Sequence, residues 1–259
     1  MTVLLTVLGI LFVYMSLAFI MSLITRDNGI ADIAYGGGFV LVVWSAYLLG
    51  APGLLSLIAC ILVSVWALRL STRIFLRNHG KTEDFRYKKW REEWGSTFVV
   101  RSFLQVFMLQ GLVIFIVSLP VSLLAIYGTM AGVNSLALAG IAVWLVGFFF
   151  EAVGDAQLGA FIKRPENKGK IMNQGLWKYT RHPNYFGESV MWWGLAIVSV
   201  SVLGNGLLGL AALAGPVLIT FLLLKVSGVP MLEARMAGNP AWEEYAKKTS
   251  VFIPLPPKK

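Results

Sequence analysis

Seven long apolar runs constrain the fold of this chain more than any other feature of its sequence. The hydrocarbon core of a membrane is about 30 Å thick, and an α-helix needs roughly 20 mostly apolar residues to cross it. Strands are excluded because an open sheet edge leaves backbone groups unpaired in lipid. We therefore predict an all-α integral membrane protein with seven transmembrane helices. The predicted spans cover approximately residues 2–24, 30–49, 52–76, 98–127, 134–160, 187–203 and 206–226.

Composition and connection lengths together predict one polytopic membrane domain over residues 1–259. The chain is 57% hydrophobic with a mean hydropathy of +0.73, well above the composition of a soluble domain. The run at 2–24 lacks the basic start and small-residue cleavage site of a signal peptide, so we expect it to be a transmembrane helix. Polar loops at 77–97 and 161–186 and an amphipathic tail at 227–259 complete the chain.

The distribution of basic residues predicts the orientation of these helices. The net charge is +9, yet the turns at 50–53, 128–133 and 204–206 contain no lysine or arginine. Basic residues gather on the cytoplasmic side of membrane proteins. We therefore expect an outside N-terminus, a cytoplasmic C-terminus and a multi-pass protein of a bacterial inner membrane or its equivalent. The charge then reflects topology and a cytoplasmic anion site, so we expect no nucleic-acid partner.

The sequence predicts no metal site and no disulfide. Cys60 is the single cysteine and lies in an apolar run, where packing explains it. His79 and His182 are the two histidines of the chain and are far apart in the sequence. A zinc ion needs several such ligands together.

Ionisable residues at membrane depth are the candidates for function, because burying them in lipid is costly. Several pairs recur four residues apart, which places both members on one helix face. Ion pairs between helices could explain any one of these residues. So could long side chains that reach the membrane–water interface. Together they predict a polar cavity open to the cytoplasm. The residues are Asp32, Arg69, Arg73, Arg101, Gln105, Glu151 and Asp155.

The polar and aromatic stretch WKYTRHPNYFGE at 177–188 precedes the sixth apolar run. Arg181, Asn184 and Glu188 share a face if this stretch is helical. Pro183 suits a first helical turn, and the N–H groups exposed at such a turn favour an anion. The stretch therefore predicts the place where a soluble anionic ligand meets the membrane cavity.

The run from Gly175 to Glu188, GLWKYTRHPNYFGE, resembles the C-terminal signature of the steroid 5α-reductase family in its bacterial branch. Asp155 on the fifth span, and Glu244–Tyr245 followed by FIP at 252–254, extend the resemblance over nearly the whole chain. The shorter pattern RHPxYxG also looks like that of sterol reductases and isoprenylcysteine carboxyl methyltransferases. The family fold has seven transmembrane helices, which agrees with the number of apolar runs.

The resemblance implies that NADPH binds from the cytosolic side and that a 3-oxo-Δ4 steroid or similar lipophilic enone enters from the bilayer. The residues that match the family's cofactor positions are Asp155, Tyr179, Asn184, Glu188, Tyr245, Arg69, Asn78 and Lys170. Five further cofactor-binding candidates come from the arginines and the RHPNY run at the mouth of the expected cavity. They are Arg73, Arg101, Arg181, His182 and Tyr185.

The catalytic candidates are Asp32, Tyr35 and Trp66. Asp32 falls where the family has a catalytic glutamate, judged by its spacing to Trp66. The chain departs from the family pattern because Ala31 replaces a glutamine and Trp66 a tyrosine. An acid that an apolar pocket keeps protonated can donate a hydrogen bond to the carbonyl oxygen of an enone while hydride reaches its β-carbon. We expect Asp32 to fill this role, with Tyr35 one turn away as a helper.

Two other function classes remain open on the sequence. The RHPxY pattern is shared with methyltransferases that use S-adenosylmethionine, a cofactor without phosphates, and the many arginines at 69–101 argue against that class. A lipid-binding or transport protein whose charges form a structural network is the non-enzyme alternative. Internal symmetry of broken helices would favour transport, and the sequence has none. Membrane lipids are expected partners in every case, and the oligomeric state is left open.

Overall fold

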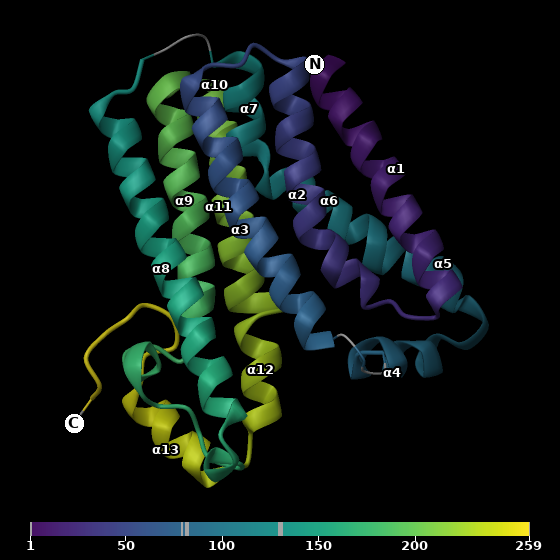
Figure 1. Cartoon of the computed structure of the whole chain (residues 1–259), viewed down its shortest axis with the longest axis vertical. Helices are drawn as coiled ribbons and strands as arrows, with labels where there is room; N and C mark the ends of the chain where they lie inside the picture. The colour runs from purple at the N-terminus through teal and green to yellow at the C-terminus, as the bar shows by residue number, and fades with distance from the viewer. Residues whose placement is uncertain (1, 79, 81–82, 129–131, 259) are drawn as a thin grey trace. The chain divides into compact units, whose positions relative to one another are not determined.

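The computed structural model describes residues 2–78, 80, 83–128 and 132–258 and is built almost wholly from helices (Figure 1). Within these described residues, seven helices are long and apolar enough to cross a membrane, which confirms the predicted all-α fold with seven transmembrane helices. Among the described residues, β-structure is limited to an isolated bridge between Thr180 and Ser250.

The helix bounds follow the apolar runs closely, with two differences. The long helices are α1 (Thr2–Thr25), α2 (Ile30–Leu49), α3 (Leu54–Asn78), α8 (Ser135–Lys163) and α9 (Pro183–Leu203). The shorter helices of the fourth and seventh spans are α4 (Phe85–Trp94), α5 (Phe98–Arg101), the π-helix η2 (Ser102–Met108), α6 (Leu109–Val117), α7 (Leu119–Tyr127), α10 (Leu207–Ala212), α11 (Ala214–Phe221) and the π-helix η5 (Leu222–Val226).

The fourth span differs from the single helix predicted at 98–127. Its long apolar helix runs over Phe85–Val117, so the helix begins inside the loop expected at 77–97. At the other end the helix breaks at Ser118, two residues before Pro120. Proline has no N–H group, and its ring clashes with the carbonyl of the preceding turn. The second difference is α9, which begins at Pro183 and not at 187 because proline fits a first helical turn.

The chain divides into two compact units. Unit 1 contains Met1–Asn134 and Ser199–Gly215, and unit 2 contains Ser135–Val198 and Pro216–Lys259.

Three consecutive glycines on α2 organise the packing of unit 1. A Cβ atom at Gly36 would lie 2.2 Å from Ser71 Oγ on α3, and one at Gly37 would lie 2.4 Å from Tyr14 Oη on α1. The third, Gly38, faces Ile114 on α6. Successive helical residues point about 100° apart, so the three glycines admit three different neighbouring helices. Small residues at such contacts let backbones approach closely within a membrane.

Unit 2 is built around a close contact between α8 and α9. A Cβ atom at Gly140 would lie 2.8 Å from Gly194 O, and one at Gly147 would lie 2.6 Å from Gly187 O. The spacing of seven residues keeps these glycines on one face of α8. Further along the same face, Gly154 lies against Pro183 in the first turn of α9.

The tail of unit 2 forms two further helices, α12 (Val229–Met236) and α13 (Pro240–Lys248). Asn239 caps α13 by accepting hydrogen bonds from Ala241 N and Trp242 N. The extended stretch after α13 runs back beside Thr180, because Arg181 N donates to Ser250 O at 2.9 Å and Leu255 N to Tyr179 O at 3.0 Å.

Candidate functional site

The predicted site residues fall into two groups, one in each unit. Unit 1 contains Asp32, Tyr35, Trp66, Arg69, Arg73, Asn78 and Arg101. Unit 2 contains Asp155, Lys170, Tyr179, Arg181, His182, Asn184, Tyr185, Glu188 and Tyr245.

Asp32 lies in the first turn of α2 and accepts hydrogen bonds on both carboxylate oxygens. Tyr87 Oη donates to Oδ1 at 2.7 Å, and Arg86 Nη2 donates to Oδ2 at 2.8 Å. The Asp32 side chain is 16% exposed. This arrangement therefore makes Asp32 an acceptor, whereas the sequence led us to expect a hydrogen-bond donor.

Arg86 is oriented by a second carboxylate, that of Asp84. Asp84 caps α4 by accepting a hydrogen bond from Arg86 N, and it also accepts one from Arg86 Nε at 3.0 Å. Burial raises the pKa of Asp84, but the hydrogen bonds and positive charge of Arg86 outweigh burial and hold this pKa below its usual value. The guanidinium group thus lies between two carboxylates.

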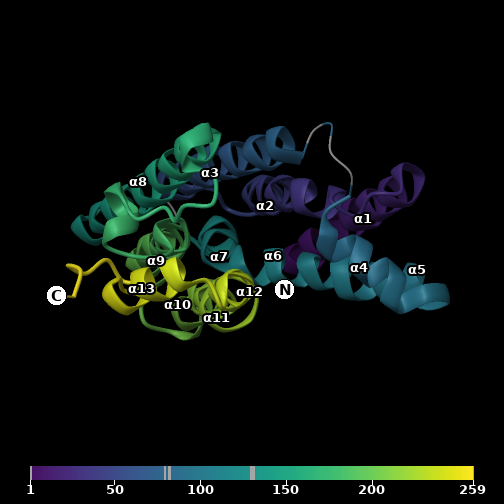
Figure 2. The same ribbon diagram turned by 90° about the horizontal axis from the view of Figure 1, so that it is seen from below.

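A second set of contacts ties α4 to the turn between α1 and α2, at the same end of unit 1 (Figures 1 and 2). Arg91 Nη2 donates to Glu83 Oε1 at 2.7 Å, and the same oxygen accepts from Asn28 N at 3.0 Å. Asn28 Nδ2 donates to Ser102 Oγ at 2.7 Å. The Arg86–Asp32 ion pair and the hydrogen bond from Asn28 N to Glu83 therefore hold α4 at the start of α2.

Tyr35 and Trp66 belong to one aromatic group. Both of their rings pack against that of Phe39, with centroid distances of 4.9 Å from Tyr35 to Phe39 and 5.1 Å from Phe39 to Trp66. Trp66 is buried, and Arg69 follows it by three residues on α3. The catalytic candidates Tyr35 and Trp66 therefore form an apolar wall within the α2–α3 pair that also carries Asp32.

The remaining candidates of unit 1 lie at helix ends. Arg73 is half-buried in the last turns of α3, and Asn78 ends this helix, where its Oδ1 accepts from Arg77 Nε at 3.2 Å. Arg101 is exposed at the end of α5.

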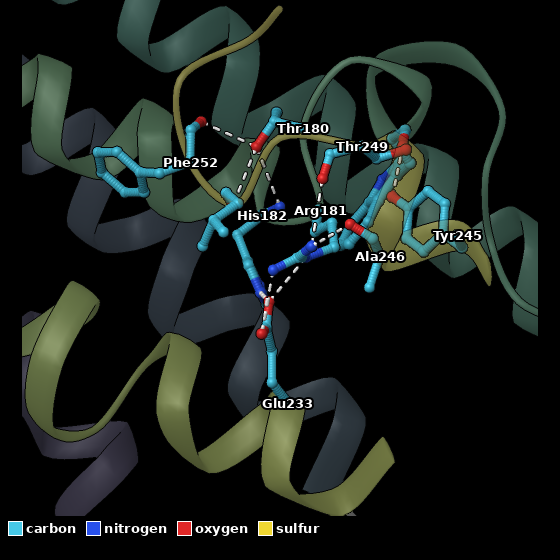
Figure 3. Close-up of polar contacts among 10 residues, drawn as sticks. Thr180, Arg181, His182, Glu233, Tyr245, Ala246, Thr249 and Phe252 are labelled. Atoms are coloured by element: carbon cyan, nitrogen blue, oxygen red, sulfur yellow. Dashed lines mark hydrogen bonds and ion pairs between the residues drawn. The ribbon is translucent and has the colours of Figure 1, made fainter. Parts of the chain in front are cut away.

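In unit 2, Arg181 is 8% exposed and each of its three guanidinium nitrogens donates a hydrogen bond (Figure 3). Nε and Nη2 donate to the two carboxylate oxygens of Glu233 on α12, at 2.8 and 3.1 Å. Nη1 donates to Ala246 O at 2.7 Å and to Thr249 O at 3.2 Å. Arg181 therefore holds the tail helices, because all four of these hydrogen bonds go to α12, α13 or the residue after α13.

His182 shares the same carboxylate. Its Nε2 lies 3.1 Å from Glu233 Oε1, and its ring stacks on that of Tyr185 with centroids 5.6 Å apart. Burial lowers the pKa of His182, and this effect exceeds the opposing influence of Glu233. The imidazole is therefore neutral at physiological pH and donates to Glu233 through Nε2.

Tyr245 fixes the loop that leads to Arg181. Its hydroxyl donates to Trp177 O, and Trp177 Nε1 donates to Gly154 O on α8 at 2.9 Å. Burial raises the pKa of Tyr245, so the phenol keeps its proton and remains a donor. Gln157 Oε1 completes the attachment by accepting from Leu176 N at 2.9 Å.

The other candidates of unit 2 lie along the α8–α9 contact or on the loop beside it. Asp155 is buried and follows Gly154 in the sequence. A Cβ atom at Gly154 would lie 3.4 Å from Asn184 N. Glu188 follows Gly187, which packs on the backbone of Glu151. Lys170 and Tyr179 are exposed. The first turns of α9, which carry Asn184 and Glu188, thus pack against the part of α8 that carries Glu151 and Asp155.

The sequence analysis missed three residues in these clusters. Arg86 and Tyr87 contact Asp32, and Glu233 contacts Arg181 and His182. Arg86 and Tyr87 lie in a loop whose basic charge was already explained by topology. Glu233 lies in a tail that reads as a surface helix. No spacing signal connects any of them to a partner more than 50 positions away. Among the described residues, no group of three or more His, Cys, Asp and Glu side chains could hold a metal ion.

Comparison with known proteins agrees with the motif at 175–188. The family described as "Protein of unknown function (DUF1295)" matches residues 18–249. The 3-oxo-5-alpha-steroid 4-dehydrogenase 1 of Rattus norvegicus is 32% identical over 123 residues, which cover 46% of this chain and 41% of that protein. The protein of the same name from Mus musculus is 42% identical over 67 residues, 26% of each chain. Steroid 5-alpha-reductase DET2 of Gossypium hirsutum is 35% identical over 69 residues, 27% of each chain.

These matches span less than half the length of the curated relatives. No solved structure matches significantly. The resemblance to the steroid 5α-reductase family that the sequence indicated is confirmed.

Proposed function

This chain belongs to the DUF1295 family and is similar to steroid 5α-reductases, and from this premise we propose that it is a membrane-embedded NADPH-dependent reductase. Its substrate is a 3-oxo-Δ4 steroid or a similar lipophilic enone that enters from the bilayer. The N-terminus lies outside, and the site opens to the cytoplasm, from which the cofactor binds. The hydrogen-bonded cluster on Asp32 is the observation that carries this proposal.

Reduction of a conjugated C=C bond builds negative charge on the carbonyl oxygen. Donors that are already oriented toward this oxygen lower the barrier, each by about 3 to 4 kcal/mol in a dry site. The guanidinium of Arg86 has N–H groups beyond those it donates to Asp32 and Asp84, and the single O–H of Tyr87 turns from Asp32 to the carbonyl when the substrate binds. We assign the carbonyl to this cluster, with Asp32 as its organiser and Tyr35 and Trp66 as the apolar wall.

The residues of unit 2 fit an anionic dinucleotide. NADPH supplies the hydride when bound. Asn184 and Glu188 on α9 and Asp155 on α8 can bind its amide and hydroxyl groups, because carboxylates and amides are the partners these groups need. Exposed cations on the adjoining loop, Lys170 among them, can bind its phosphates. Because four of the five guanidinium N–H groups of Arg181 already donate to Glu233 and the tail carbonyls, we assign it no phosphate.

Cofactor binding to the purified protein in detergent tests this proposal. A ligand at a hundredfold excess over its Kd stabilises the folded state by about 2.7 kcal/mol, which a thermal shift detects. We expect NADPH to raise the Tm, NADH to raise it less, and S-adenosylmethionine to leave it unchanged. Loss of reduced-nicotinamide absorbance on addition of a 3-oxo-Δ4 steroid then measures turnover.

Two outcomes would overturn the proposal. Stabilisation by S-adenosylmethionine in place of NADPH would assign the chain to methyl transfer. No stabilisation by any of the three cofactors would favour a lipid-binding or transport protein.

A further inference from the structure

One carboxylate in unit 2 holds two consecutive side chains of the sequence motif. Glu233 Oε1 lies 2.8 Å from Arg181 Nε and 3.1 Å from His182 Nε2, and Glu233 Oε2 lies 3.1 Å from Arg181 Nη2 (Figure 3). Glu233 is on α12, 52 positions after Arg181. A paired, planar contact of this kind fixes direction as well as distance.

The other contacts of Arg181 bring the rest of the tail to the same point. The Ala246 and Thr249 carbonyls accept from Nη1, and the guanidinium lies 5.9 Å from the centroid of the Trp242 ring. Thr180 Oγ1 donates to Phe252 O at 2.8 Å. The end of the loop before α9 is therefore attached to α12, to α13 and to the extended stretch that follows α13.

Burial makes this attachment selective for one arrangement. Arg181 is 8% exposed and His182 is 2% exposed. The Glu233 side chain is 26% exposed, so the ion pair is only partly buried, but loss of this carboxylate leaves the buried guanidinium of Arg181 without its charged partner. The attachment therefore selects one position of the chain at residues 181–182. Pro183 and Asn184 follow directly as the first turn of α9, against Gly154 and beside Asp155.

We propose that Glu233 is a positioning residue for the cofactor site. It holds Arg181 and His182, and through them it sets the first turn of α9, which presents Asn184 and Glu188. This scheme assigns neither Arg181 nor His182 to NADPH, because four N–H groups of Arg181 and Nε2 of His182 already face Glu233 and the tail carbonyls. The inference rests on the proposed function, since it concerns the site assigned there to the cofactor.

The test substitutes Glu233→Gln, which keeps the shape and removes the charge. Glu244→Gln is the matched control, because Glu244 lies on α13 in an exposed ion pair with Lys248 and its side chain is 72% exposed. We expect Glu233→Gln to raise the Kd for NADPH by at least about tenfold, as a small misplacement of binding groups does. The KM for the enone should stay within about twofold of that of the native protein.

A second readout measures position directly and needs no cofactor. Hydrogen–deuterium exchange of the peptide covering residues 179–190 should be faster in Glu233→Gln than in the native protein, and unchanged in Glu244→Gln. Equal exchange in all three proteins would overturn the proposal.

A double variant separates positioning from simple stabilisation. Arg181→Met with Glu233→Met leaves no stranded charge, so we expect it to recover part of the Tm lost in Glu233→Gln, although the Ala246 and Thr249 carbonyls lose their donor. If Glu233 positions the site, the NADPH Kd of this double variant stays raised. If the Kd recovers together with the Tm, the role of Glu233 is structural and the proposal is wrong. Failure of the native protein itself to bind NADPH would instead overturn the proposed function.

Discussion

The guanidinium Nη2 of Arg86 lies 2.8 Å from Oδ2 of Asp32, although 54 positions separate the two residues. This contact places α4, a helix in the polar loop of the sequence, against the carboxylate of Asp32 at the start of α2. Tyr87, the next residue, donates to the other oxygen of the same carboxylate. One acid therefore orients two donors, and this changes which side chains we expect to meet a substrate carbonyl.

Tyr87→Phe tests the role of the phenol. The variant keeps the ring and loses the O–H donor, so we expect kcat/KM for the enone to fall roughly a hundredfold with an unchanged Kd for NADPH. Steady-state kinetics and a binding titration give the two quantities. Tyr47→Phe, toward the other end of α2, is the control and should keep native kinetics. A native kcat/KM for Tyr87→Phe would remove the phenol from the mechanism.

The Asp32–Arg86 ion pair should couple the two residues in stability. Arg86→Met leaves the Asp32 carboxylate with one donor fewer, and we expect a loss of about 1 to 2 kcal/mol, limited by the partial exposure of the pair. Asp32→Asn in the same protein should recover part of this loss. The free energies of unfolding of the two single variants and the double variant form a thermodynamic cycle. Strict additivity would show that the contact contributes nothing.

The buried imidazole of His182 should make the protein less stable in acid. Burial lowers its pKa from an ordinary value of about 6.5, so the unfolded chain binds a proton at a higher pH than the folded chain. Stability is therefore full above about pH 6.5 and falls as the pH decreases toward the folded-state pKa.

The measurement for His182 is the Tm between about pH 5 and pH 8. His182→Gln keeps a donor that can face Glu233 and does not titrate. We expect its Tm to vary less with pH than that of the native protein. Parallel pH profiles for the two proteins would mean that protonation of His182 does not limit stability.

Gly147 should be intolerant of a side chain because α8 and α9 approach most closely there. A Cβ atom would lie 2.6 Å from Gly187 O and 2.6 Å from Met191 N, both of them backbone atoms. We expect Gly147→Ala to lower stability by about 1 to 3 kcal/mol. Gly159→Ala on the same helix meets nothing within 4 Å, and the better helix propensity of alanine should stabilise it slightly. Thermal unfolding in detergent compares the two, and equal Tm values would contradict the close contact.

The sequence by itself determined the number of membrane helices and most of their bounds. The thickness of the hydrocarbon core fixes the length of an apolar run, and this length can be counted without knowing any neighbour. Pro183 likewise indicated a first helical turn, since its fixed geometry suits such a turn whatever surrounds it, although the predicted span began only at 187. The motif at 175–188 indicated the family for the same local reason.

Only the tertiary structure decided which partner each buried charge has. Arg181 was expected at the mouth of a cavity and is instead enclosed by Glu233 and the tail carbonyls. Asp32 was expected to be a donor and is an acceptor for Arg86 and Tyr87. In each case the partner lies more than 50 positions away. Periodicity reports which residues share a face of one helix, whereas contacts between distant segments depend on how the helices and loops pack.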